Sequence, residues 1–279
     1  MHLKHLSFIL IALTVSVLTQ AQKLPNIQEA SLRAPSNVMI DGKAQEWNNQ
    51  FQAYNHAADI FYTISNDDNK LYLIIQAIDH TVINKILGGG IIFTVNTSGE
   101  KNLSNGARLT YPILDLHNRI WVNLPDQPDN TNQADSIMNV KNKDFANKSK
   151  IIGVKGVKGL DTILSIYNRD GIKAAGTFNS KLYFTYELSI DLKLLGLAIG
   201  NPAKFAYNIR LPGVNMQAVY AASGQATTVT SAGYVLANGI LPGFTEEYVR
   251  TNQPSFPHKV HMVDFMNPTN FWGEYILKK

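Results

Sequence analysis

The stretch VMIDGKAQEWNNQFQAYNHAADIFYTISNDDNKLYLIIQAID, residues 38–79, decides the fold that this sequence predicts. Its apolar start, residues 38–40, predicts a short strand that ends at an Asp-Gly turn. Residues 60–64 and 71–77 have the composition of strands, and an Asn/Asp-rich turn joins them into a pair. The second of these strands is apolar on both faces, which predicts a central and buried position in a sheet.

The rest of the chain continues in the same way, with short strands between polar turns. The predicted strands are residues 91–97, 108–116, 120–122, 151–157, 162–167, 173–178, 182–190, 204–211, 259–265 and 270–277. Residues 80–87 predict one or two helical turns, whereas residues 123–135 predict a solvated loop, and no long amphipathic helix is expected. This pattern predicts an all-β fold, an antiparallel β-sandwich formed as one domain by residues 22–279.

Short motifs in this chain resemble a known family. The matching residues are Asp41, Gly42, Glu46, Trp47, Asp68, Leu71, Tyr72 and Asp79, followed by residues 186–190, 195–197 and the strand 205–211. In this order they resemble the family 9 carbohydrate-binding modules, which belong to the DOMON-like β-sandwiches with immunoglobulin-like or jelly-roll-like architecture. Asp191 departs from the pattern, because family members tend to have Pro there. The resemblance implies non-catalytic binding of an oligo- or polysaccharide, in the service of polysaccharide breakdown, and a structural calcium ion in some members.

The first 21 residues predict a cleavable signal peptide. Lys4 gives a basic start, residues 6–18 are almost wholly apolar, and a small residue, Ala21, stands at the expected cut. The apolar run is too short to span a bilayer as a helix. We therefore expect an exported protein, periplasmic or extracellular, with no membrane span.

Composition narrows the function classes further. The chain has no Cys, which excludes disulfides, thiolate metal sites and a lipid anchor on a Cys after the signal. The formal net charge is +4 and the Lys residues are scattered, so no basic run follows a phosphate backbone. Nucleic acid is therefore not an expected partner, and a possible protein partner stays unknown.

Aromatic side chains are the first candidates for a saccharide site. The apolar face of a sugar ring stacks on an indole or phenol ring, while Asn and Asp side chains bond the hydroxyl groups. Trp121 precedes the predicted polar loop, Trp272 lies in the last strand, and Tyr111 is a weaker candidate. Asn123 and Asp126 in the loop are the polar candidates. The alternative for each aromatic ring is a place in the core, which we expect for Trp47 in particular.

Three carboxylates are candidates for a calcium site. Asp41, Glu46 and Asp79 flank the deciding strands, and hard oxygen ligands suit this ion. The alternative is that Asp41 and Asp79 bond the backbone of the turns in which they lie.

Other functions stay open. A glycoside-processing enzyme needs two carboxylates, and Glu187 and Asp191 share one strand face, although a strand-borne Glu is usually at the surface. A haem-binding DOMON-like module would use Met and His ligands. The candidates are Met216, Met262 and Met266 with His80, His258 or His261. A purely structural module that docks onto another protein is the last alternative.

Overall fold

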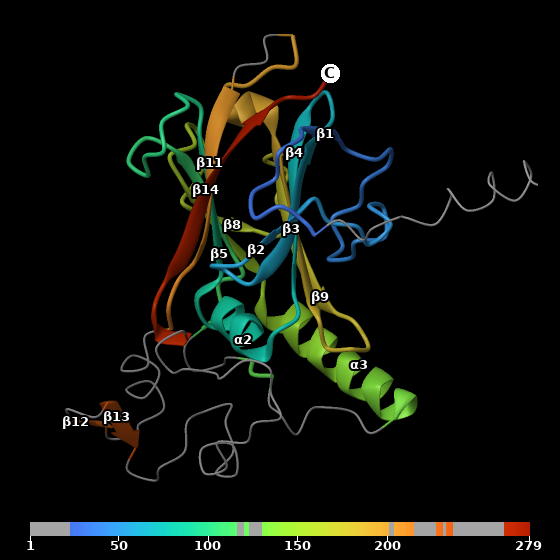
Figure 1. Cartoon of the computed structure of the whole chain (residues 1–279), viewed down its shortest axis with the longest axis vertical. Coiled ribbons are helices and arrows are strands. Elements are labelled where there is room, and N and C mark those ends of the chain that lie inside the picture. Colours follow the sequence, from blue (N-terminus) through green and yellow to red (C-terminus); the bar gives the residue numbers. More distant parts are fainter. Residues whose placement is uncertain are drawn as a thin grey trace, which may run out of the picture.

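The computed structural model describes residues 23–115, 120–122, 130–200, 204–214, 227–230, 233–236 and 265–279, and there it is an antiparallel β-sandwich of two six-stranded sheets, as predicted (Figure 1). Sheet A contains β1 (Leu32–Arg33), β2 (Ala53–Asn55), β3 (Ile60–Asn66), β4 (Lys70–Ala77), β9 (Ile172–Phe178) and β10 (Phe184–Asp191). Sheet B contains β5 (Ile91–Asn96), β6 (Ala107–Tyr111), β7 (Ile151–Lys155), β8 (Ile163–Ser165), β11 (Lys204–Leu211) and β14 (Thr269–Ile276). A separate two-stranded sheet joins β12 (Thr227–Thr230) to β13 (Gly233–Leu236).

The strand order brings distant parts of the sequence together. Sheet A runs β1-β3-β4-β10-β9, with β2 on the edge of β3, and sheet B runs β14-β11-β5-β6-β7-β8. The deciding strand β4 lies between β3 and β10, which confirms its predicted central position. The hairpin of β9 and β10 is also confirmed, and it pairs Thr185 with Thr177.

One core fills the space between the sheets, because each strand turns alternate residues inward. In β10, Phe184, Tyr186 and Leu188 belong to this core, as their alternation predicts. The phenol groups of Tyr62 in sheet A and Tyr207 in sheet B share a hydrogen bond of 3.0 Å across the core. Both rings are fully buried, so this polar contact lies inside the apolar layer.

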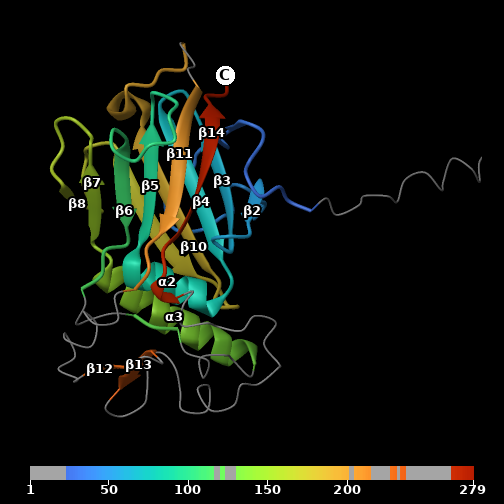
Figure 2. The ribbon, with the colours of Figure 1, turned by 60° about the vertical axis from the view of Figure 1, so that its left-hand side comes forward.

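Two helices lie at the same end of the sandwich (Figures 1 and 2). α2 (His80–Gly89) is the predicted short helix, and it ends at Gly90 with φ 75°. α3 (Thr131–Lys148) contradicts the prediction, because its first residues were expected in a solvated loop. Only Ala134 and Phe145 of α3 are buried, so its sequence lacks the apolar stripe that reveals a helix. A single 3-10 turn, η3 (Leu192–Leu195), follows β10.

Two further strand predictions were wrong: one predicted strand does not form, and another ends earlier than predicted. Residues 38–40 form no strand; they belong to the cover segment, residues 34–51, which lies on the outer face of sheet A (Figure 1). β6 ends at Tyr111, before Pro112, and it lies between β5 and β7 rather than at an edge.

Several predictions lie outside the described residues. They concern the signal peptide, the loop residues Asn123 and Asp126, and most of the predicted strand 259–265. In the described part of the chain, neither helix is long and apolar enough to cross a membrane.

Candidate functional site

Trp272 lies on the outer face of sheet B, in a row of side chains that crosses the sheet. The register places it opposite Asn208 on β11, Asn208 opposite Thr94 on β5, and Thr94 opposite Arg108 on β6. Phe271 and Tyr275, its neighbours on β14, point into the core, so Trp272 points outward. We call Trp272, Asn208, Thr94, Arg108 and Arg210 the Trp272 face.

The Trp272 face contains buried polar atoms that lack a partner. Asn208 and Thr94 are fully buried, although they lie on the outer face of the sheet. The amide nitrogen of Asn208 donates to the carbonyl oxygen of Phe271 at 2.8 Å, but its Oδ1 accepts no hydrogen bond, and neither does Thr94 Oγ1. The Nε atoms of Arg108 and Arg210 are unpartnered as well. Each buried polar group without a hydrogen-bond partner destabilises a fold by about 1–3 kcal/mol, so four such atoms on one sheet face are unusual.

The outer face of sheet B is not freely accessible at every residue, because Asn208 and Thr94 on it are 0% exposed. Figure 2 looks onto it, and no described helix or strand lies over β5, β11 or the middle of β14. Trp272 itself is partly exposed. Towards one end of the face, Glu274 pairs with Lys204 at 2.8 Å and with Lys101 at 3.6 Å. The partly exposed indole of Trp272 is the group on this face against which an apolar ring could stack.

Trp121 lies elsewhere, near α2. Its ring contacts Phe265 with centroids 5.9 Å apart, and Lys141 donates to its carbonyl oxygen at 2.6 Å. Asn84 holds the next residue in place, since it donates to the carbonyl oxygen of Val122 and accepts from its amide, both at 2.8 Å. Trp121 is partly exposed, and no ring contact joins it to Trp272 in the described part of the chain.

The other two aromatic candidates lie in apolar layers. Trp47 is 6% exposed and packs edge-on against Tyr72, as expected for a core residue. Tyr111 is 2% exposed, with its ring against Phe145 and its hydroxyl 3.1 Å from Ser149 Oγ. A saccharide cannot stack on a ring buried in this way, so the prediction for Tyr111 does not fit the structure.

The three calcium candidates do not form a group. Asp79 is the N-cap of α2 and accepts from the amides of Thr81 and Val82 at 2.8 and 3.1 Å. Asp41 accepts from the amide and the amine of Lys43, whereas Glu46 accepts from the amide of Met39. Within the described ranges, no group of three His, Asp or Glu side chains could hold a metal ion. The bonds to turn backbones, stated above as the alternative, are the ones found for Asp41 and Asp79.

Glu187 is buried, although a strand-borne Glu was expected at the surface. It is 1% exposed, beneath the turn of the cover segment. Its Oε2 accepts from the amides of Asp41 at 2.9 Å and Gly42 at 2.8 Å, while its Oε1 has no partner. Burial raises the pKa of Glu187 to about 8, against the lowering effect of these two amides. Asp191 lies on the same strand and lines a pocket whose lining does not include Glu187.

Of the haem candidates, only His80 and Met266 lie in the described part of the chain. His80 is the first residue of α2, and Met266 directly follows Phe265. Met216, His258, His261 and Met262 lie outside the described residues.

The residues that lie beside Trp272 on the sheet were not predicted from the sequence. Alternation in residues 204–211 marks Asn208 and Arg210 as outward positions, since Phe205, Tyr207 and Ile209 are apolar. That signal does not show which strands are neighbours. Only the pairing of β14 with β11, and of β11 with β5, brings Trp272, Asn208 and Thr94 into one row.

The fold and the Trp272 face together define this chain as an all-β sandwich with an aromatic and polar outer surface. No protein-family model matches the sequence, and no curated protein matches it. Among solved structures, the chain is similar to a carbohydrate binding module family 9 (CBM9) from Caldicellulosiruptor kristjanssonii in complex with glucose. The identity is 11%, the match covers 68% of this chain and 80% of that chain, and the TM-score is 0.34. Similarity at this level carries no argument about ligand or site.

Proposed function

We propose that this chain is a non-catalytic carbohydrate-binding β-sandwich, and that its saccharide site is the Trp272 face. The observation that carries the proposal is the partly exposed indole of Trp272 beside the unpartnered Asn208 Oδ1 and Thr94 Oγ1. A bound sugar would supply hydrogen-bond partners to Asn208 Oδ1 and Thr94 Oγ1 and an apolar surface to the indole of Trp272. Its C–H face covers the indole, and its hydroxyl groups hydrogen-bond to the amide, hydroxyl and guanidinium groups along the row.

The proposed mechanism is therefore stacking combined with in-plane hydrogen bonds. Three elements of the sheet hold the groups in place, since β14, β11 and β5 form continuous antiparallel pairs. Sites held by strands need little reordering when the ligand binds, which lowers the entropic cost of association. Residues 1–21 have the composition of a signal peptide, so we propose that the protein meets its saccharide after export.

The test uses the purified chain without its first 21 residues and a panel of neutral polysaccharides, with retention measured by affinity electrophoresis. We expect the wild type to be retained by at least one polymer without release of new reducing ends. Trp272→Ala should weaken binding at least about tenfold, which corresponds to about 1.4 kcal/mol. Ile276→Ala is the matched control, because Ile276 is an exposed apolar residue on the same strand and face.

The circular dichroism spectrum must stay unchanged in both variants. Retention that survives Trp272→Ala would overturn the assignment of the Trp272 face. New reducing ends would favour the glycoside-processing alternative instead.

A further inference from the structure

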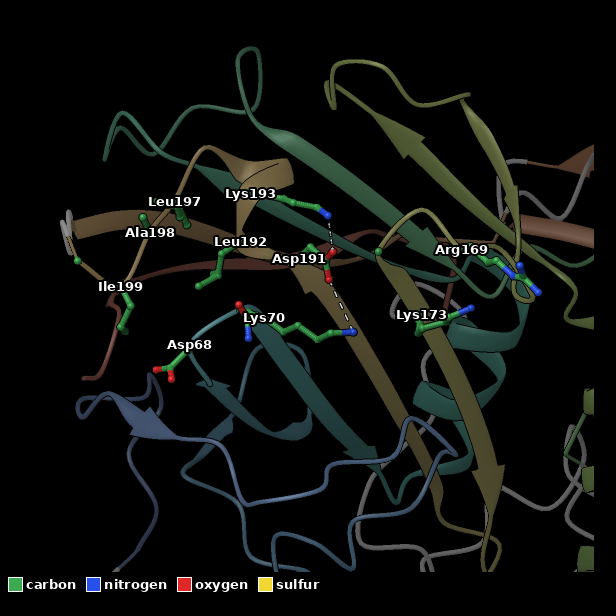
Figure 3. A pocket seen from close by; sticks show the side chains of 13 residues that line it. Asp68, Lys70, Arg169, Lys173, Asp191, Leu192, Lys193, Leu197, Ala198 and Ile199 are labelled. Atoms are coloured by element: carbon green, nitrogen blue, oxygen red, sulfur yellow. Dashed lines mark ion pairs between the residues drawn. The ribbon is translucent and has the colours of Figure 1, made fainter.

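A cavity of about 620 Å³ opens at the end of sheet A where β4 begins and β10 ends (Figure 3). We call it the Asp191 pocket. Its lining residues are Asp68, Asn69, Lys70, Arg169, Gly171, Lys173, Asp191, Leu192, Lys193, Leu197, Ala198, Ile199 and Gly200. The Trp272 face belongs to sheet B, so the two surfaces are built from different sheets.

Four cationic side chains from four segments line this pocket, and in Figure 3 those of Arg169 and Lys173 point away from Asp191. Lys70 begins β4, Lys173 lies in β9, Lys193 lies in η3, and Arg169 precedes β9. Asp68 does not offset them, since it pairs with Arg33, outside the lining, at 2.8 Å. Within the lining, Asp191 is the carboxylate that pairs with these cations, and Asp67, outside the lining, also acts on Lys70.

The carboxylate of Asp191 packs against Gly171 and interacts with two lysine side chains. Its carboxylate lies against Gly171, where an added Cβ would come within 2.5 Å of Asp191 Oδ2. From there it faces Lys70 Nζ at 3.7 Å and Lys193 Nζ at 3.4 Å, as Figure 3 shows. Both distances exceed those of a charge-assisted hydrogen bond, and the side chains of Lys70 and Lys193 are 37% and 79% exposed, so both ammonium groups remain accessible to a ligand from solvent.

The remaining cations have still weaker partners. Lys173 Nζ donates to the carbonyl oxygen of Asn168, a neutral group. Arg169 makes no ion pair with any of the described residues. On the other side, Leu197, Ala198 and Ile199 give the pocket an apolar wall (Figure 3). Cations beside an apolar wall suit a ligand that has both an anionic group and a C–H surface.

We propose that the Asp191 pocket binds the anionic group of an acidic saccharide, either the carboxylate of a uronic acid or a sulfate ester. The anion pairs with the cations of the lining beside Asp191, and the sugar ring lies against Ile199 and Leu197. This inference deepens the proposed function and depends on it for the saccharide that carries the anion.

The experiment is calorimetric titration of the chain without its first 21 residues at low ionic strength. Three probes of equal length are used: an oligogalacturonate, a sulfated galactan oligosaccharide and a neutral galactan oligosaccharide. The variants are Arg169→Gln and Lys193→Gln, singly and together. Lys158→Gln is the control, because Lys158 is an exposed cation outside the lining and its loss changes the net charge equally.

At least one acidic probe should bind more tightly than the neutral one. Each pocket variant should weaken that binding about threefold to fivefold, and the double variant about tenfold or more, while Lys158→Gln should change it little. The preferred acidic probe identifies carboxylate or sulfate as the group recognised.

Two results would overturn the proposal that the Asp191 pocket binds an anionic group. One is the failure of both acidic probes to bind more tightly than the neutral one, and the other is an equal loss with Lys158→Gln, which would indicate general charge attraction. Trp272→Ala separates the two proposals. If it abolishes neutral binding while the pocket variants have no effect, only the Asp191 pocket falls. If the pocket variants weaken acidic binding while Trp272→Ala has no effect on any probe, only the Trp272 face falls.

Discussion

The carboxylate of Glu187 accepts a hydrogen bond of 2.8 Å from the amide of Gly42, which joins two residues 145 positions apart. Thr177 strengthens this junction, because its hydroxyl donates to the carbonyl oxygen of Gly42 at 2.6 Å. The turn at Gly42 is thereby fixed onto the outer face of β9 and β10. The position of the cover segment thus depends on the buried carboxyl group of Glu187, whose pKa is raised to about 8.

Glu187 should make the stability of the protein pH-dependent. Its pKa is raised from 4.5 to about 8 in the folded state, so the unfolded state loses its proton first as the pH rises. The free energy of unfolding should therefore fall between about pH 4.5 and pH 8 and level off above, by up to roughly 4 kcal/mol. Urea denaturation at about pH 5, 6.5, 8 and 9 measures this change.

Glu187→Gln supplies the control for that prediction. The amide side chain keeps an oxygen for the amides of Asp41 and Gly42 but does not titrate in this range. Its stability should be nearly constant over the same pH window. Equal pH slopes in the wild type and the variant would show that another group is responsible.

Gly42→Ala should destabilise the fold through a direct clash. Gly42 has φ 84°, and an added Cβ would lie 2.7 Å from the carbonyl carbon of Gly176. Gly159 is a matched site, since it has φ 78° but nothing within 4 Å of the added Cβ. Gly159→Ala should cost only about 1–2 kcal/mol for the left-handed backbone, and Gly42→Ala roughly 2 kcal/mol more. Equal losses of unfolding free energy in Gly42→Ala and Gly159→Ala would mean that the cover segment moves to accommodate the added methyl group at no measurable cost.

Thr94→Val should stabilise the free protein and weaken saccharide binding. Valine has nearly the same shape, and the hydroxyl that it removes is buried without a partner. The free protein should gain about 1 kcal/mol, because an unmet polar group is removed. Thermal unfolding without and with saccharide measures both effects. Lower stability of the free variant would show that the hydroxyl has a partner in solution.

Asn84→Ala should release the segment that contains Trp121. The change removes both 2.8 Å bonds to Val122, and the expected loss is roughly 2–3 kcal/mol, with a red shift of Trp fluorescence as Trp121 becomes more exposed. Asn142→Ala is the comparison, because Asn142 holds Phe178 by the same two-bond arrangement, and Phe178 lies outside the segment that contains Trp121. A red shift of equal size in both variants would indicate general loosening rather than release of Trp121.

Much of the fold could be predicted from local pattern. The strands β4, β5, β9, β10, β11 and β14 were recognised by their alternation or apolar composition, and the helical turns predicted for residues 80–87 correspond to α2. The long helix α3 could not be recognised, because it buries little more than Phe145 and presents mostly polar residues. The burial of Glu187 was equally hidden. It results from the cover segment folding onto sheet A, a contact between residues far apart in sequence.

The candidate site was predictable only in part. Trp272 was predicted as the second stacking candidate after Trp121, and the structure places its partly exposed ring on the outer face of sheet B, while its role stays a prediction. Asn208 and Thr94 lie far from it in sequence, so their role depends on strand pairing. Asn123 and Asp126, the polar residues predicted for the site, lie outside the described residues and stay a prediction.

The most direct test of the central claim is nuclear magnetic resonance of the isotope-labelled protein, titrated with the neutral saccharide that it retains. The account predicts that the indole N–H of Trp272 and the side-chain amide of Asn208 shift with a single dissociation constant. Shifts confined to Trp121, or to the backbone around Asp191, would contradict the assignment of the Trp272 face.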